Sequence, residues 1–407
     1  METRRSTKLA LALTGGGFTG YLFEVGALTG LDDLLGESFT TNDFDMYVGV
    51  SAGSAVATLL AQGVKPEEIL ATNLSGKRPY YFEHRDIFRP AIGEGVKTIW
   101  RAMKQLVPLL RLYVSNYHEM TAIDLLDKAQ DALPSGIYRL EPFAKYLEQT
   151  FKAKGLGLRF VDLRKDLYIP AIDLESGDSV IFGDESWRDI SIAQAVTASS
   201  AAPIYFCPVR IEGRDYIDAG IGRPAFFDLA VAKQVDLMVM INPMARIPLP
   251  CASWRESART PRICRLRDKG FLTIGEQAGR INFDARLSQA LTMFQQDYPD
   301  KDLFMITPSA HDALLFERSF LSYQDRVHLL RAGYQSVTTL VRDRYDTLQA
   351  RFARHGIALE RMSFEDRARS RMAQLDQIVA ASVPSQVTAN GAVTGLGPSG
   401  AACQHAK

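Results

Sequence analysis

The stretch MYVGVSAGSAVATLLAQG, residues 46–63, places Ser51 within G-V-S-A-G, between an apolar run and a segment with helical spacing of its apolar residues. The run over 44–50 predicts a buried strand, and 52–63 predicts a helix that ends at Gly63. In a nucleophile elbow, the glycines two before and two after the serine leave room for a sharp strand-to-helix turn that exposes the hydroxyl. The same pattern also fits a small residue packed where a helix crosses a sheet.

A second glycine-rich turn lies one strand earlier. KLALAL, residues 8–13, predicts a buried strand that runs into T-G-G-G-F-T-G and then into a helix ending at Gly36. This order opens a parallel α/β layer fold, in which ligands bind at the C-terminal ends of the strands. Such a loop can aim several N–H groups at a phosphate or an oxyanion. Because it does not match G-x-G-x-x-G, an oxyanion hole is the better interpretation, with a purely structural turn as the alternative.

The rest of the chain continues the alternation of strands and helices. Apolar runs around Ser176-Gly177 predict a hairpin over 167–184, and a helix is expected near 189–198. Buried strands are expected over 235–243 and 302–308, with a helix near 272–297 between them and charged helical patterns over 320–354 and 364–380.

A nucleophilic serine needs a base, and the histidines after Ser51 do not supply a convincing one. An α/β-hydrolase places several strands before its elbow, whereas only 50 residues precede Ser51. Asp218 fits better, because it ends the strand expected in DYIDAGIGRP and could project its carboxylate over the sheet edge. Burial in an apolar pocket would raise its pKa from about 3.9 and make it a better proton acceptor. A turn-capping aspartate is the alternative. The histidines are His84, His118, His311, His328, His355 and His405.

Composition narrows the class of protein. Lys+Arg and Asp+Glu number 47 each in 407 residues, so no net charge favours nucleic acid as a partner. Four scattered cysteines suit a reducing compartment. The apolar run Leu9–Leu13 is too short for a signal peptide, and no run of eighteen apolar residues predicts a membrane span, so a cytoplasmic protein is expected. The chain has no H-E-x-x-H, Walker or calcium-loop motif, and neither a metal nor an organic cofactor is expected.

Taken together, LTGGGFTG, G-V-S-A-G, ASSAAPIYFCPV and DYIDAG resemble the patatin-like phospholipases in content, order and spacing. The resemblance implies a three-layer α/β/α fold with a mainly parallel central sheet and a Ser–Asp dyad that hydrolyses acyl esters of glycerolipids through an acyl-enzyme. By position, it makes Ser51 the nucleophile, Asp218 the base, and Gly15, Gly16 and Gly17 the oxyanion hole. Ser199–Pro203 would line the site structurally.

Two positions depart from the family's pattern. Thr19 stands where the glycine loop commonly carries arginine, so that a positive charge near the oxyanion hole is lost. Ala219 follows Asp218 where the family usually has glycine, and it would strain or re-aim the aspartate if a glycine-only dihedral were needed. Neither change removes a reacting group.

The resemblance covers 8–310, which is the expected acyl hydrolase domain, with a helical insert or lid over 64–165. A helical extension over 311–380 and a disordered tail over 381–407, rich in Gly, Ser, Ala and Pro, are expected to follow. Within the insert, VKTIWRAMKQLVPLLRLYV, residues 96–114, has an apolar face with Trp100 edged by lysine and arginine. This pattern fits peripheral contact with a membrane, and equally a lid or a core helix.

The sequence therefore predicts a cytoplasmic serine lipid acyl hydrolase of the phospholipase A or lysophospholipase type, acting on lipid acyl esters. A thioesterase or polyester depolymerase on the same scaffold is one alternative. A catalytically weak lipid-binding or regulatory protein is another, with Thr19 and Ala219 as signs of decay; the intact elbow and Asp218 count against it.

Overall fold

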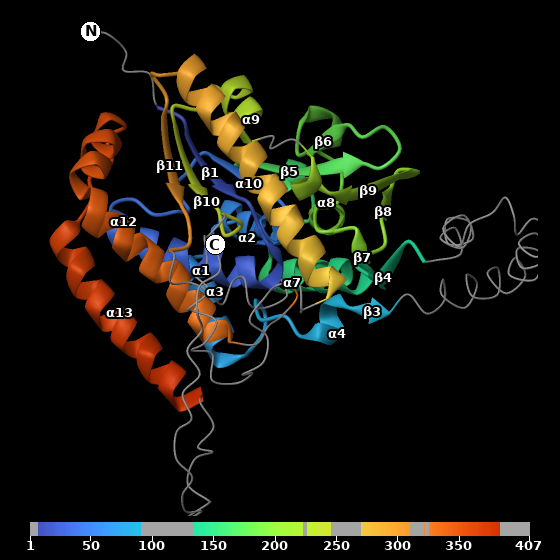
Figure 1. The fold of residues 1–407 in the computed structure, drawn as a ribbon, viewed down its shortest axis with the longest axis horizontal. Helices are drawn as coiled ribbons and strands as arrows, with labels where there is room; N and C mark the ends of the chain where they lie inside the picture. Colours follow the sequence, from blue (N-terminus) through green and yellow to red (C-terminus); the bar gives the residue numbers. More distant parts are fainter. Residues whose placement is uncertain are drawn as a thin grey trace, which may run out of the picture.

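The computed structural model describes residues 7–90, 134–222, 226–245, 270–309, 321 and 325–382. Within them, the centre of the molecule is an eight-stranded sheet in the order β11-β10-β1-β2-β5-β9-β8, with β6 paired to β5 beside this path (Figure 1). The strands are β1 (Leu9–Leu13), β2 (Met46–Gly49), β5 (Asp166–Asp173), β6 (Ser179–Phe182), β8 (Val209–Ile211), β9 (Arg214–Asp218), β10 (Leu237–Ile241) and β11 (Asp302–Ile306).

The sheet is mainly parallel, as predicted. Strands β11, β10, β1, β2 and β5 pair in parallel, whereas β6 and β9 run antiparallel to β5, and β8 runs antiparallel to β9. The C-terminal ends of β1 and β2 therefore lie at one edge of the sheet, where the two glycine-rich turns meet.

Helices cover both faces of the sheet. Alternate residues of β1 divide between two cores, because side chains along a strand point to opposite faces: Leu11 lies in one core and Ala12 in the other. This confirms the predicted three layers. The first face carries α1 (Gly17–Leu35), α2 (Ala52–Ala61), α3 (Pro66–Ser75), α7 (Glu141–Lys154), α8 (Ile192–Ser199), α12 (Arg326–Arg354) and α13 (Arg361–Ser382); the second carries α9 (Phe226–Ala232) and α10 (Phe271–Asp297).

The described parts of the expected helical insert are not entirely helical. Beside α3, α7 and the short α4 (His84–Ile87), they contain β3 (Arg89–Pro90) and β4 (Gly136–Arg139). These two strands form a small second sheet with β7 (Ile204–Phe206). The amphipathic helix expected over 96–114 lies outside the described residues, as does the tail beyond residue 382. No described helix combines the length and the apolar character that crossing a bilayer requires.

The C-terminal helices pack against the back of α1. A Cβ added at Gly26 would lie 1.9 Å from the carbonyl oxygen of Leu330 in α12, and one added at Gly333 would lie 2.0 Å from that of Phe23. These two helices thus touch backbone to backbone, which only glycine allows. The division of the chain at residue 310 stays a prediction, although α12 is integral to one face of the sheet.

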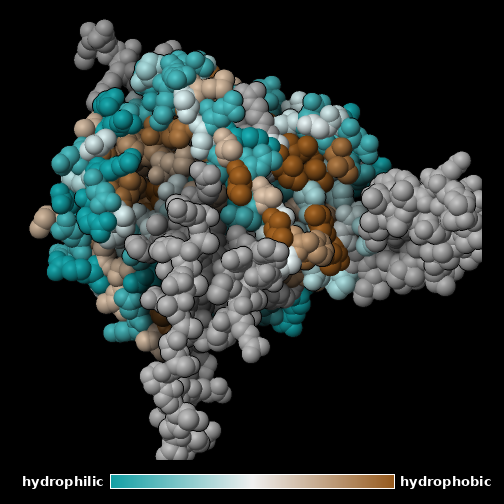
Figure 2. Space-filling view, viewed as in Figure 1, coloured by the Kyte–Doolittle hydropathy of each residue, from teal (hydrophilic) through white to brown (hydrophobic). Residues whose placement is uncertain are grey.

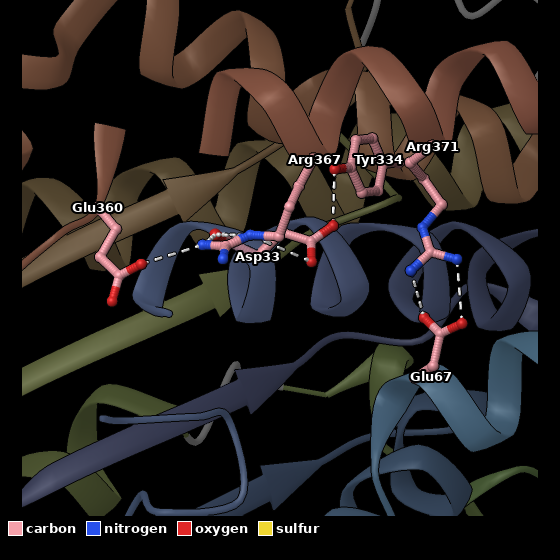
Figure 3. Close-up of polar contacts among 6 residues, drawn as sticks. All are labelled: Asp33, Glu67, Tyr334, Glu360, Arg367 and Arg371. Atoms are coloured by element: carbon pink, nitrogen blue, oxygen red, sulfur yellow. Dashed lines mark hydrogen bonds and ion pairs between the residues drawn. The ribbon is translucent and has the colours of Figure 1, made fainter. Parts of the chain in front are cut away.

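Polar contacts hold α12 and α13 to the surface of the first layer (Figure 3). The Tyr334 hydroxyl donates to the Asp33 carboxylate at 2.7 Å, and Arg367 donates to the Asp33 carbonyl oxygen from Nη2 at 2.6 Å. Farther along, both Nη atoms of Arg371 pair with the Glu67 carboxylate of α3, at 3.0 and 2.6 Å. The bonds to Asp33 are partly buried, whereas the Arg371–Glu67 pair is exposed and so orients α13 more than it stabilises it.

Candidate active site

Ser51 sits on a strained turn between β2 and α2. Its φ of 53° is unusual for a residue with a side chain, and its own position is the N-cap of α2. The turn is possible because its neighbours are glycines: a Cβ on Gly49 would lie 2.5 Å from the Cα of Ser54, and one on Gly53 would lie 2.7 Å from the carbonyl oxygen of Leu13. The geometry is that of a nucleophile elbow.

The loop that follows β1 packs directly against this elbow. Gly15, Gly16 and Gly17 have φ values of 77°, 111° and 65°, so three successive residues lie in a region that favours glycine. A Cβ on Gly15 would lie 2.4 Å from the carbonyl oxygen of Val50. The two glycine motifs therefore need glycine partly because their backbones touch each other.

The N–H groups of this loop differ in what they bind. The N–H of Gly15 donates to Oε1 of Glu24 at 2.8 Å, beneath the loop. Among the described residues, no acceptor bonds the N–H of Gly16 or Gly17, and both of these glycines line the cavity that contains Ser51. Gly17 begins α1 and Ala52 begins α2, so the positive ends of two helix dipoles point to the same place.

Strand register brings Asp218 level with Ser51. Val48 of β2 pairs with Tyr168 of β5, and Ala171, three residues farther along β5, pairs with Asp218. Ser51 also stands three residues beyond Val48. Because β9 runs antiparallel to β5, it returns toward the elbow and ends there. The aspartate thus reaches the serine across the extended end of β5.

The Asp218 carboxyl is buried and lies beside the Ser51 hydroxyl in the lining of the same cavity. Burial raises the pKa of Asp218 to about 6, while the neighbouring Ser51 hydroxyl and the N–H of Gly220, which donates to the carboxylate at 2.7 Å, oppose this rise. A carboxyl with a pKa near 6 is a stronger base than an ordinary aspartate and is still ionised at neutral pH.

The C-terminal end of α8 and the residues that follow it contact both Ser51 and Asp218. The Ser51 N–H donates to Oγ of Ser199 at 3.0 Å, and the Asp218 N–H donates to the carbonyl oxygen of Ala201 at 3.1 Å. Both partners are fully buried. This segment was expected only to line the site; its specific bond from Ser199 to the elbow was missed, because the two serines are 148 positions apart.

The two departures from the family's pattern have local explanations. Thr19 is buried and donates from Oγ1 to the carbonyl oxygen of Gly16 at 3.2 Å, so it holds the glycine loop. Ala219 begins a short 3₁₀ helix over Ala219–Ile221 and is not among the residues with positive φ. Ala219 therefore carries none of the backbone strain that was expected there, because this turn does not require the positive φ that favours glycine.

A cavity of about 340 Å³ opens over Ser51 and Asp218. Hydrophobic surface continues around its mouth, where Phe271 is 79% exposed and Ile204 is 61% exposed, and such surface is visible on this side of the molecule in Figure 2. Apart from Asp218, the charged residues that line the cavity are Glu276 and Arg280 of α10. The apolar wall includes Phe18, Phe82, Phe143, Phe206, Phe271 and Phe283.

Helix α10 both lines the cavity and holds the loop after Asp218. Nη2 of Arg286 donates to the carbonyl oxygen of Gly220 at 3.1 Å, and Nη1 donates to that of Ile221. Across the mouth, the Tyr205 hydroxyl donates to Oε1 of Glu276 at 2.7 Å. No sequence motif marked these residues. The sequence did mark Glu24 as unusual, because it is the one charged residue within the apolar stretch YLFEVGAL, residues 21–28.

Histidine is absent from the described residues that line the cavity. His328 lies in α12, and Nε2 of His355 lies 2.9 Å from Oδ2 of Asp302, at the N-terminal end of β11 and hence at the opposite edge of the sheet. His118, His311 and His405 are outside the described residues, and so is the side chain of His84. Among described side chains, no three His, Cys, Asp or Glu gather as metal ligands would.

Comparison with known proteins agrees with this geometry. The family model for "Patatin-like phospholipase" matches residues 11–231, more than half of the chain, and this span contains both glycine motifs and Asp218. The chain therefore belongs to the patatin-like phospholipase family, as its motifs predicted.

Individual relatives are distant. A protein described as "Probable lipid hydrolase 463L", from Invertebrate iridescent virus 6, is 23% identical over 229 residues, which cover 54% of this chain and 62% of the relative. The chain thus spans less than two thirds of that relative. VipD from Legionella pneumophila aligns over 83% of this chain and 67% of its own at 14% identity and a TM-score of 0.34. A structure of SpcU in complex with ExoU from Pseudomonas aeruginosa aligns over 72% of this chain and 53% of its own, at 16% identity and a TM-score of 0.28.

Proposed function

We propose that this protein is a serine lipid acyl hydrolase of the phospholipase A or lysophospholipase type. The observation that carries the proposal is the placement of the Ser51 hydroxyl beside a buried carboxyl, that of Asp218, at the floor of an apolar cavity. Such a cavity fits an acyl chain, and the distant viral relative is described as a probable lipid hydrolase.

In the proposed reaction, Asp218 accepts the proton of Ser51 as Oγ attacks the ester carbonyl carbon. The N–H groups of Gly16 and Gly17 donate to the oxyanion of the tetrahedral intermediate, helped by the N-terminus of α1. Since the Gly15 N–H is already bonded to Glu24, we assign Gly15 to the shape of the oxyanion hole and not to donation.

The intermediate collapses with cleavage of the bond between the carbonyl carbon and the alcohol oxygen. Asp218 returns its proton to the leaving alcohol, and Ser51 keeps the acyl group as an ester. Asp218 then accepts a proton from a water molecule, which attacks the acyl-enzyme. The fatty acid leaves as Ser51 recovers its proton, so the dyad ends each cycle in its starting state.

The cellular setting belongs to the same proposal. A cytoplasmic enzyme that contacts lipid peripherally accounts for the apolar mouth of the cavity. The contact predicted for 96–114 and the division into a domain over 8–310 and an extension over 311–380 are also retained as proposals.

The test combines an active-site probe with a substrate panel. Wild type should be labelled by a fluorophosphonate and should cleave phospholipids in preference to acylglycerols, acyl-CoAs and polyesters. We expect Ser51→Ala to abolish labelling and to lower kcat by about 10⁴-fold or more, and Asp218→Asn to lower it by roughly 10³-fold. Undiminished labelling of Ser51→Ala would reject the nucleophile. Preference for a thioester or polyester would select the alternative enzyme, and failure to label wild type would favour a lipid-binding protein.

A further inference from the structure

Glu24 is a buried acidic residue that the reaction above does not use. It lies in α1, two turns after Gly17, and its side chain is fully buried. Oε1 accepts the N–H of Gly15 at 2.8 Å, and within the part of the chain that the structure describes Oε2 has no hydrogen-bond partner. A glutamate without an ion-pair partner in a core is costly and calls for an explanation.

The contact of Glu24 lies at the base of the proposed oxyanion hole. Gly15 directly precedes Gly16 and Gly17, and its backbone contacts α1 at two places: its N–H donates to Glu24, and its carbonyl oxygen would be 2.2 Å from a Cβ on Gly20. The absence of a side chain at Gly20 lets the loop fold down, and Glu24 then holds it there.

Support from the other side of the loop is separate. Thr14 donates from Oγ1 to Oδ1 of Asn242 at 3.0 Å, and the N–H of Met244 donates to the same oxygen at 3.0 Å. These bonds hold the end of β1, but neither of them involves the backbone of Gly15. Among the described residues, only the Glu24 side chain bonds the Gly15 N–H.

We propose that Glu24 is a positioning residue that aims the N–H groups of Gly16 and Gly17 at the oxyanion by holding the peptide of Gly15. This inference rests on the proposed function. Burial raises the pKa of Glu24 well above its ordinary range, which favours the neutral acid. A neutral carboxyl keeps a hydrogen-bond acceptor under the loop without placing a negative charge beside a developing oxyanion.

The experiment compares Glu24→Gln, which keeps a neutral acceptor, with Glu24→Met, which has similar length and no oxygen. A soluble short-chain p-nitrophenyl ester reports kcat and KM, and fluorophosphonate labelling reports reactivity. Since small misplacement of catalytic groups is costly, we expect Glu24→Met to lose about 30- to 100-fold in kcat with KM within about threefold. Glu24→Gln should stay within about threefold of wild type in both constants.

Thr29→Val is the matched control, because it removes another buried side-chain hydrogen bond of α1, from Thr29 to the Val25 carbonyl oxygen. It should lower the midpoint of thermal unfolding without changing kcat. If Glu24→Met does not fold, Glu24→Ala provides the same comparison. A folded Met or Ala variant with wild-type kcat, or a Gln variant as impaired as Met, would overturn the role of Glu24. An inactive, unlabelled wild type would instead overturn the proposed function.

Discussion

Helix α1 depends on glycine in two regions, for different reasons. At its N-terminus, Gly15 and Gly16 adopt positive φ, and Gly16 lines the cavity. Along its back, Gly26 and Gly30 simply leave space for α12. In the first region glycine provides a backbone conformation and polar groups for chemistry, and in the second it provides close packing. Variants in the first region should therefore change activity, and variants in the second should change stability.

The largest expected effect on stability is that of Gly26→Ala. The new Cβ would lie 1.9 Å from the Leu330 carbonyl oxygen, so two helix backbones must move apart. We expect a loss of about 3 kcal/mol in the free energy of unfolding, measured by urea titration, with unchanged kcat for the folded enzyme.

Gly30→Ala is the graded control for this prediction. Its Cβ would lie 3.1 Å from the Cβ of Val337, a side-chain atom that can shift more easily than backbone. We expect a cost of about 1 kcal/mol or less. Equal costs at Gly26 and Gly30, or a fall in kcat of the folded enzyme, would remove the distinction between the two regions.

The second prediction concerns the pH dependence that Asp218 creates. Because the pKa of Asp218 is raised to about 6 in the folded protein, the protonated acid is favoured there, and stability is lost as pH rises through 6. The expected loss between pH 4 and pH 8 is about 2.5 kcal/mol from this group. Activity should change in the opposite direction, with kcat/KM rising through pH 6 as the base ionises.

Asp218→Asn isolates this contribution from those of other acids, among them Asp32, whose pKa is also raised to about 6 by burial. The difference in unfolding free energy between wild type and Asp218→Asn should shift in favour of the variant as pH rises from about 4 to 6, and should level off above about pH 7. If urea titrations at several pH values gave a constant difference, the raised pKa of Asp218 would be wrong.

The smallest expected effect is that of Ala219→Gly, which restores the family's usual residue. Since Ala219 already has an ordinary φ, glycine relieves no strain and only adds freedom to the unfolded chain. We expect less than threefold change in kcat and a loss of stability of about 0.5 kcal/mol. An increase in kcat of tenfold or more would mean that alanine does mis-aim Asp218.

Sequence reasoning was most successful where the determinants are contiguous. The strand, glycine loop and helix around Gly15–Gly17, and those around Ser51, were predicted because hydrophobic periodicity and glycine spacing act within about 20 residues. Ser199 and Arg286 were not assigned their contacts, because their partners are distant in sequence: the Ser51 N–H and the Gly220 carbonyl oxygen. Neither contact leaves a periodic pattern.

The sequence by itself determined the layer fold, the two glycine turns and the family, because these depend on local conformation and on short motifs. Only the tertiary structure decided that Asp218 lies level with Ser51, since that depends on the register of β2, β5 and β9. It also decided the pKa of Asp218 and the bond from Gly15 to Glu24. The pKa depends on burial by elements far apart in the chain, because desolvation is a property of the packed molecule. The bond joins residues only nine positions apart, but it depends on how the glycine loop folds back onto α1.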